Sequence, residues 1–290
     1  MKGWLVVNAF LSSEKFSGIY SLLLESAKLH NISLELLTSA DLSHIVGGNL
    51  NGREYPDFVI FWDKDICLAK ALESAGIRLF NCADAVEACD NKALTSILLS
   101  KAGVRIPKTI IAPKTFEGVG YSNLGFLDNA IEKLGLPLVI KESYGSFGMQ
   151  VYLAESRESA VEIIKKLGHK DFIMQEFISS SCGRDLRINV VGNRVVASIY
   201  RYNDEDFRSN LTIGGKMKPH LATEAQQALA ISACKALKLD FAGVDVMFGE
   251  GDEPVICEVN SNTHFRTTLD CTGVNLADSI MEYIAGEMKK

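Results

Sequence analysis

The chain of 290 residues is 47% hydrophobic and 23% charged, with a formal net charge of −6. This length suffices for a large buried core, and the negative charge argues against nucleic acid or an anionic membrane as a partner. The seven cysteines lack the paired spacing of a zinc site, and their odd number argues against a disulfide framework, which favours a reducing, cytoplasmic setting.

The first third of the chain alternates between strand-like and helix-like patterns. The opening segment Met1–Phe10 has too short an apolar run for a signal peptide, and no apolar stretch approaches membrane-spanning length. The expected elements are a strand at Gly3–Asn8, a helix at Glu14–Leu29, strands at Ile32–Leu37 and Asp57–Phe61, a helix near Lys64–Ala75 and a strand at Arg78–Phe80. This alternation predicts a parallel sheet covered by helices, without the glycine fingerprint of a dinucleotide-binding domain.

The pattern changes around Asn81–Asp90, after which helices are separated by short strands. The expected elements are a helix from Asp90 to Gly103, a helix at Asn123–Leu134, strands at Leu138–Lys141 and Met149–Ala154, and a helix at Arg157–Leu167. A glycine-containing turn joins the two strands.

From Asp171 onward the strands are longer and consecutive, which favours an antiparallel sheet. The expected elements are strands at Phe172–Phe177, Asp185–Val191 and Val195–Tyr202, a loop at Asn203–His220, a helix at Glu224–Leu239, strands at Phe241–Phe248 and Pro254–Asn260, and a helix at Val274–Ala285. The sequence therefore predicts a mixed α/β (α+β) fold of three lobes, at residues 1–88, 89–172 and 173–290.

Two acidic residues lie inside the last two apolar strands. A register that pairs Phe248 with Val255 would place Asp245 directly opposite Glu258, and Asn260 lies on the same face as Glu258. Like charges opposite one another destabilise a sheet unless something neutralises them, and carboxylate and amide oxygens suit a hard divalent cation. We predict a metal site here; the alternative is a carboxylate that faces solvent or meets an arginine.

Lys141 ends a buried strand and precedes a turn with glycines at positions 145 and 148 and a serine at 146. Glycines allow backbone N–H groups to converge on phosphate oxygens, and the lysine adds a positive charge. The turn Gly145, Ser146, Gly148 is thus a candidate phosphate-binding loop, although such turns are common between strands. It is not a Walker loop, because no helix with Gly-Lys-Ser/Thr follows.

A strand end with mixed polar and apolar character follows in the next part of the chain. Its residues are Gln175, Glu176, Phe177 and Ile178. Such a segment can hold a purine ring through its backbone and a ribose through its carboxylate, and an ordinary strand end is the alternative.

Alternating polar residues occur on the following strands. Asp185 and Arg187 lie on one face, and Arg201, Arg208 and Asn210 follow. Arginines beside a metal–phosphate site would stabilise an anionic transition state or bind a substrate carboxylate, whereas surface ion pairs are the alternative. Arg201 is the arginine most readily explained as a surface residue.

At the start of the second lobe, Asp90-Asn-Lys92 is compatible with a simple helix cap at Asp90 and an exposed Lys92.

Taken in order, these segments resemble the ATP-grasp ligases, and most closely the RimK type that adds glutamate to a carboxylate. The resemblance covers about two-thirds of the chain. The matching segments are Asp90-Asn-Lys92, Val139-Ile-Lys141, Gly145-Ser-Phe-Gly148, Gln175-Glu-Phe-Ile178, Asp185-Leu-Arg187, Asp206-Phe-Arg-Ser-Asn-Leu211, Gly214-Gly215, Ala242-Gly-Val-Asp245 and Glu258-Val-Asn260. The resemblance implies a Rossmann-like pre-ATP-grasp domain over residues 1–88, an ATP-grasp central lobe over 89–172 and a C-terminal lobe over 173–290.

The resemblance also implies roles for individual residues. Lys92 and Lys141 would contact nucleotide phosphates, the backbone at Glu176 and Phe177 would hold adenine, and Glu176 or Asp185 would bind ribose. Arg208 would meet the γ-phosphate and the acyl phosphate. Asp245, Glu258 and Asn260, with Asn210 nearby, would bind Mg²⁺ or Mn²⁺, and Arg201 would bind the carboxylate of the amino acid.

The implied reaction is an ATP-dependent carboxylate–amine ligation through an acyl phosphate, with a protein, peptide or small-molecule acceptor. A small-molecule kinase and a nucleotide-binding module without ligase activity are the alternatives.

The sequence departs from the family after the metal-binding asparagine, where Asn260-Ser-Asn-Thr-His-Phe-Arg266 replaces the usual Ser-Pro-Gly, and at Tyr200-Arg201, where two basic residues are usual. Both departures lie where the acceptor and the amino acid would bind. His264 and Arg266 are compatible with an unusual acceptor pocket, and a structural role of a loop histidine is the alternative. A homo-oligomer is compatible with the sequence, but no pattern indicates it.

Overall fold

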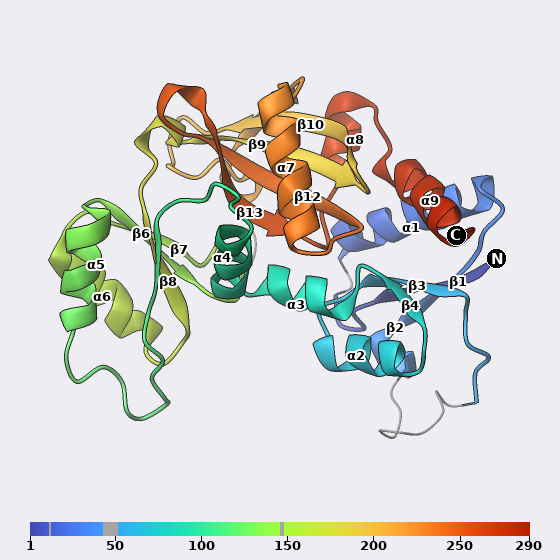
Figure 1. Cartoon of the computed structure of the whole chain (residues 1–290), viewed down its shortest axis with the longest axis horizontal. Coiled ribbons are helices and arrows are strands. Elements are labelled where there is room, and N and C mark those ends of the chain that lie inside the picture. The colour runs from blue at the N-terminus through green and yellow to red at the C-terminus, as the bar shows by residue number, and fades with distance from the viewer. Residues whose placement is uncertain (12, 43–51, 146–147) are drawn as a thin grey trace.

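The computed structural model describes residues 1–11, 13–42, 52–145 and 148–290. Within these residues the strands form three separate sheets, of four, four and five strands. The three sheets follow one another along the long axis of the molecule, with the second sheet at the left of Figure 1, the third in the middle and the first at the right. None of the helices in the described residues combines the length and the apolar character that a membrane span requires.

The first sheet has the order β2-β1-β3-β4, and all its neighbouring strands are parallel. This confirms the prediction from the alternating pattern. Its strands and helices are β1 (Lys2–Val7), α1 (Glu14–Leu29), β2 (Ser33–Thr38), β3 (Phe58–Trp62), α2 (Ile66–Ser74), β4 (Arg78–Phe80) and α3 (Ala83–Asp90). β3 is buried at every position, as expected for a parallel strand covered on both faces.

The second sheet has the order β5-β8-β6-β7 and is antiparallel. Its elements are α4 (Lys92–Lys101), β5 (Thr109–Ile111), α5 (Gly125–Leu134), β6 (Leu138–Glu142), β7 (Val151–Ala154), α6 (Arg157–Leu167) and β8 (Phe172–Glu176). The sequence predicts that Phe172–Phe177 opens the last sheet, and this is wrong. β8 pairs with β5 and β6 because Phe172 and Met174 complete the apolar core under α5 and α6.

The third sheet has the order β11-β10-β9-β12-β13 and is antiparallel throughout. Its elements are β9 (Arg184–Val191), β10 (Arg194–Tyr202), β11 (Lys216–Pro219), α7 (Glu224–Ala236), β12 (Phe241–Phe248), β13 (Pro254–Asn260), α8 (Arg266–Thr272) and α9 (Leu276–Glu287). Short 3-10 helices occur at Ser39–Leu42, Ser179–Ser181, Leu211–Ile213 and Glu250–Asp252. The sequence does not predict β11 and α8, which are too short for a clear period.

A β-bulge lies in the hairpin of β12 and β13. Phe248 pairs with Pro254, one residue earlier than predicted, and Cys257 is the additional residue of the bulge. The bulge restores the expected pairing further along, so Asp245 lies directly opposite Glu258. That pairing is confirmed, but through an irregular hairpin rather than a continuous register.

The apolar cores show how the three sheets are joined. The first and third sheets share one core, in which Trp62 and Ile60 of β3 pack with Phe241, Phe265 and helix α9. The core under α5, α6 and the second sheet is separate from it. A further core lies between the third sheet and α7, and Leu99 of α4 packs into it, so α4 joins the second lobe to the third sheet.

Candidate functional site

A cleft of about 790 Å³, part of it open to solvent, is lined by residues from both the second and the third sheets. Thirteen residues that the sequence singles out line it: Lys92, Lys141, Gly148, Gln175, Glu176, Phe177, Ile178, Asp185, Arg201, Arg208, Asn210, Asp245 and Glu258. Gly145, Arg187 and Asn260 lie outside the lining. Ser146 lies outside the residues that the structure describes.

A row of charged side chains crosses the third sheet at the cleft. The strand registers place Arg201 opposite Asp185, Arg187 opposite Asp245, and Asp245 opposite Glu258. Arg201 Nη2 lies 2.5 Å from Asp185 Oδ2 and 3.0 Å from Asp245 Oδ1. The row therefore contains two arginine–aspartate pairs, and it ends with two carboxylates, Asp245 and Glu258, on adjacent strands.

Arg201 is not a surface residue, contrary to the simplest interpretation of its sequence. Its exposed fraction is 6%, because β11 covers the edge of β10 and the guanidinium points toward two carboxylates. Burial alone would lower the pKa of the guanidinium, but Asp185 and Asp245 outweigh burial and raise it. Arg201 is therefore a fixed positive charge.

Both carboxylate oxygens of Asp245 are engaged by arginines. Arg187 Nε donates to Oδ1 and Nη2 donates to Oδ2 at 2.9 Å, while Arg201 also contacts Oδ1. Burial opposes ionisation of this carboxyl group, but the two guanidinium charges outweigh burial and hold its pKa below the ordinary value. The alternative of a carboxylate that meets an arginine thus applies to Asp245 in this structure.

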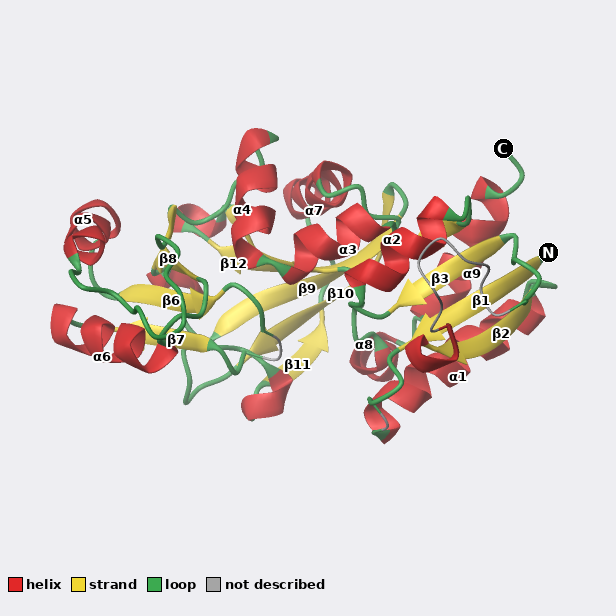
Figure 2. Ribbon diagram, turned by 90° about the horizontal axis from the view of Figure 1, so that it is seen from below, coloured by secondary structure: helices red, strands yellow, loops and turns green. Residues whose placement is uncertain are grey.

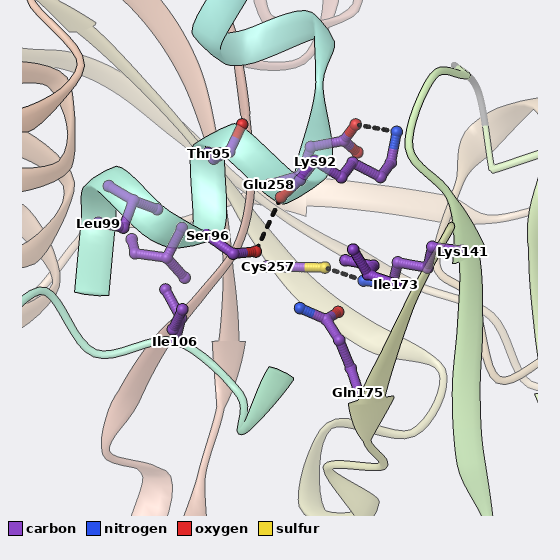
Figure 3. A pocket seen from close by; sticks show the side chains of 11 residues that line it. Lys92, Thr95, Ser96, Leu99, Ile106, Lys141, Ile173, Gln175, Cys257 and Glu258 are labelled. Carbon is purple, nitrogen blue, oxygen red and sulfur yellow. Dashed lines mark hydrogen bonds and ion pairs between the residues drawn. The ribbon is translucent and has the colours of Figure 1, made fainter. Parts of the chain in front are cut away.

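Lys92 connects the glycine turn to the third sheet. Its Nζ donates to the carbonyl of Gly145 at 3.0 Å and lies 3.4 Å from Glu258 Oε1, as Figure 3 shows for the ion pair. The lysine is positioned by helix α4, whose first turn is capped by the side chain of Asn91. The alternative of a helix cap at Asp90 does not hold, because Asp90 ends the preceding helix and Asn91 has the extended conformation of a cap.

Lys141 and Cys257 approach each other where the two sheets meet. Lys141 Nζ lies 3.8 Å from Cys257 Sγ, and Figure 3 shows both side chains directed into the same pocket. Lys141 is 8% exposed. Burial raises the pKa of the Cys257 thiol, against the opposing charge of Lys141. A buried ammonium whose nearest partner is a neutral thiol can bind an anionic ligand without first breaking an ion pair.

The strand end after β8 is held by its own side chains. Gln175 Nε2 donates to Thr109 Oγ1 at 2.9 Å, and Glu176 Oε1 accepts from the backbone N–H of Lys108 at 2.8 Å. The ring of Phe177 lies 6.3 Å from that of Phe207 in an edge-on arrangement. These contacts fix the segment at one wall of the cleft.

Arg208 and Asn210 reach the glycine turn from the other wall. Arg208 Nη1 donates to the carbonyl of Gly148 at 2.8 Å, and Asp206 holds the rest of the guanidinium. The φ of Gly148 is +73°, and a Cβ there would lie 2.7 Å from Asn210 Oδ1. Only glycine suits both the backbone conformation and this close approach.

The predicted metal ligands are partly assembled. Asp245 and Glu258 are opposite each other, and Asn260 Nδ2 donates to the carbonyl of Gly243 at 3.4 Å on the same two strands. Within the described residues, no three side chains among histidine, cysteine, aspartate and glutamate form a metal-binding group. Two carboxylates and one amide nevertheless supply only oxygen donors, which is the chemistry that suits Mg²⁺.

The structure adds cleft residues that the sequence does not single out. Cys257, Met247 and Arg184 line the cleft beside the predicted set. The alternation along β12 places Met247 on the face of Asp245, so this residue could have been found. Cys257 could not, because strict alternation puts it on the face opposite to Glu258 and only the bulge brings both into the cleft.

Comparison with known proteins agrees with this arrangement. Residues 89–284 match the family model described as a RimK-like ATP-grasp domain. An uncharacterized protein of Mycoplasma pneumoniae is 31% identical over 272 residues, covering 91% of this chain and 92% of its own length. Probable alpha-L-glutamate ligase 2 of Shewanella amazonensis is 36% identical over 220 residues, covering 75% of this chain and 70% of its own length.

A solved structure matches almost the whole chain. The RimK domain ATP-grasp protein of Sphaerobacter thermophilus aligns with a TM-score of 0.73 over 98% of this chain and 99% of its own, at 20% sequence identity. At this identity the match concerns the fold alone, and it confirms the predicted mixed α/β class, including the first sheet, which the family model does not cover.

Proposed function

Because this chain belongs to the RimK-like ATP-grasp family and is an ATP-dependent ligase, we propose that it joins an amino acid to a carboxylate through an amide bond. The carboxylate is first phosphorylated by ATP, and the amine then displaces phosphate from the acyl phosphate. The observation that carries this proposal is the charged row of the third sheet, which faces Lys92 and Lys141 across the cleft.

We propose that the nucleotide occupies this cleft. Two lysines supply positive charge for the phosphates. Lys141 is buried and has no carboxylate partner among the described residues, and Lys92 lies at the start of helix α4. The backbone at Glu176 and Phe177 forms the wall for adenine. Arg208 lies beside Gly148, where its guanidinium can neutralise the phosphate in transfer.

We propose that Asp245, Glu258 and Asn260 hold Mg²⁺. Bound there, the ion would neutralise the negative charge that builds up on phosphate oxygens. Arg187 and Arg201 neutralise Asp245 in this structure, so a metal ion would compete with these two guanidinium groups for its carboxylate. The ligation itself needs no nucleophilic side chain, because positioning and charge neutralisation favour both displacement steps.

We propose glutamate as the amine, with a protein, peptide or small molecule as the acceptor. The support is the name of the Shewanella relative, a probable alpha-L-glutamate ligase. Arg201 is buried between Asp185 and Asp245, so we assign it to fixing the charged row rather than to binding the amino-acid carboxylate.

We also propose that the chain divides near residue 88 and again after Glu176. The second boundary is placed beyond residue 172 because β8 pairs within the second sheet.

The test is release of ADP and phosphate from magnesium-ATP, with a panel of amino acids offered against candidate carboxylates. Release that depends on a particular amine, with an amide product by mass spectrometry, would support the ligase and identify its substrate. A stable phosphorylated product without any amide would point to a kinase instead. ATP binding without turnover on the panel would favour a binding module.

A further inference from the structure

Asn81 follows β4 and is completely buried between the first and third sheets. Its Oδ1 accepts from the backbone N–H groups of Asp240 and Phe241, at 2.7 and 3.1 Å. Its Nδ2 donates to the carbonyls of Phe241 and Ser261, at 3.0 and 3.1 Å. The side-chain amide therefore pairs with both backbone groups of Phe241, as the backbone of a neighbouring strand would.

The four hydrogen bonds close one end of the hairpin that carries the predicted metal ligands. β12 begins at Phe241 and β13 ends at Asn260, and Gly243 pairs with Asn260 two residues inside that end. Asn81 thus holds the start of one strand and the residue that follows the other. One side chain from the first lobe thus spans the two strands where they separate beyond Asn260.

The segment after Asn260 is held at each of the next positions. Asn262 Nδ2 donates to the carbonyl of Asp63 at 3.0 Å, and His264 Nε2 lies 3.0 Å from the carbonyl of Lys15. Thr263 Oγ1 accepts from Arg187 at 3.2 Å. These contacts come from the first sheet, from α1 and from the charged row, so the segment cannot shift without moving all three.

Close packing leaves the segment little room. A Cβ added at Gly243 would lie 2.1 Å from Thr263 Oγ1 and 3.1 Å from the Cδ of Arg187. The glycine of the Ala-Gly-Val-Asp segment is therefore needed for the approach of Thr263. A displaced Ser261 would carry Thr263 against Gly243 or Arg187.

We propose that Asn81 is a positioning residue that holds Asn260, opposite Gly243, next to the carboxylate pair of Asp245 and Glu258. Asn81 does not line the proposed nucleotide cleft, and it contacts none of the side chains proposed as metal ligands. It acts through the backbone of Phe241 and Ser261. This inference rests on the proposed function, since it takes Asn260 as a metal ligand.

The test compares Asn81→Ala with Arg78→Ala. Arg78 also joins β4 to the start of β12, through an ion pair of 2.8 Å with Asp240, but it makes no contact with the end of β13 among the described residues. Both variants weaken the junction of the two lobes. Only Asn81→Ala should weaken Mn²⁺ binding in the presence of a non-hydrolysable ATP analogue, by about 10-fold or more, and speed amide exchange at residues 258–263.

Equal metal affinity in the two variants, with equal exchange at residues 258–263, would overturn the assignment. If the wild-type protein binds no Mn²⁺ with the analogue, the metal site of the proposed function fails, and the exchange comparison still decides the role of Asn81. If Asn81→Ala does not fold, the wild-type protein provides the test. Mn²⁺ with the analogue should then slow exchange of the Phe241 amide, and an unchanged rate would refute the coupling.

Discussion

The third sheet meets its two neighbours through junctions of opposite character. Toward the first sheet, Trp62 stacks on Phe241 with ring centroids 5.5 Å apart and meets Phe265 edge-on at 6.0 Å, inside a shared core. Toward the second sheet, Leu99 of α4 packs into the core of the third sheet, but the contacts at the open cleft are polar: an ion pair between Lys92 and Glu258 and an amine–thiol contact between Lys141 and Cys257. One junction excludes water, and the other leaves space for charged ligands.

This difference indicates how the chain separates stability from binding. Apolar burial stabilises the first junction whether or not a ligand is present. The second junction contains buried positive charge at Lys141 that no carboxylate neutralises among the described residues, so an anion should strengthen it. Substitutions at the two junctions should therefore change different measurements.

The largest effect is expected at the apolar junction. Trp62→Ala should lower the free energy of unfolding by about 3–5 kcal/mol, because it removes a buried ring that contacts two others. Urea unfolding measures the loss. Nucleotide affinity of the folded variant should stay within about 2-fold of wild type, a change of roughly 0.4 kcal/mol. If Trp62→Ala lowered the free energy of unfolding and the nucleotide affinity together, the two junctions would not be independent.

The next effect is expected in turnover. Glu258→Ala should lower the rate by at least about 100-fold, because the proposed metal loses a carboxylate ligand, while the melting temperature changes little. Glu253→Ala is the matched control. Glu253 lies on the same hairpin but outside the cleft, and its carboxylate pairs with Arg105. Near-normal activity of Glu258→Ala would rule out the metal assignment.

A smaller effect is expected from Lys92→Met. Loss of the charge should weaken ATP binding by about 10-fold, or roughly 1.4 kcal/mol, by calorimetry. Lys101→Met, at the exposed other end of the same helix, should leave the affinity unchanged. If both variants bind ATP equally, the polar junction does not depend on Lys92.

The smallest effect is a pH dependence at the first junction. Burial lowers the pKa of His264, whose ring packs edge-on against Phe16, so the folded protein holds this proton less tightly than the unfolded chain. The stability from neutral His264 is complete above the unfolded pKa of about 6.5 and is lost as the pH falls below it. Between pH 7 and pH 5, the melting temperature of the wild-type protein should fall further than that of His264→Gln. Identical losses would contradict this assignment.

Patterns within single strands predict most of the fold and part of the site. Alternation places Asp245 and Glu258 on one face, and the pairing of the last two strands brings them opposite each other. The parallel first sheet follows from the alternation of strands with helices.

Contacts between strands distant in the sequence are not predictable in this way. The burial of Arg201 depends on β11, which the loop-like composition of residues 203–220 conceals. Membership of β8 in the second sheet depends on core partners in α5 and α6. Asn81 has no local signal, because its role arises from backbone groups about 160 and 180 positions later in the chain.

The edge strand β11 has a consequence for self-association. An unpaired strand edge can recruit a strand from another chain, and exposed lysines or proline oppose such recruitment. β11 presents Lys216 and Lys218 to solvent and ends at Pro219, which has no N–H to donate. At the opposite edge, Ile256 of β13 already donates its N–H to the carbonyl of Arg105. Edge-to-edge growth of this sheet into fibrous assemblies is therefore disfavoured on both sides.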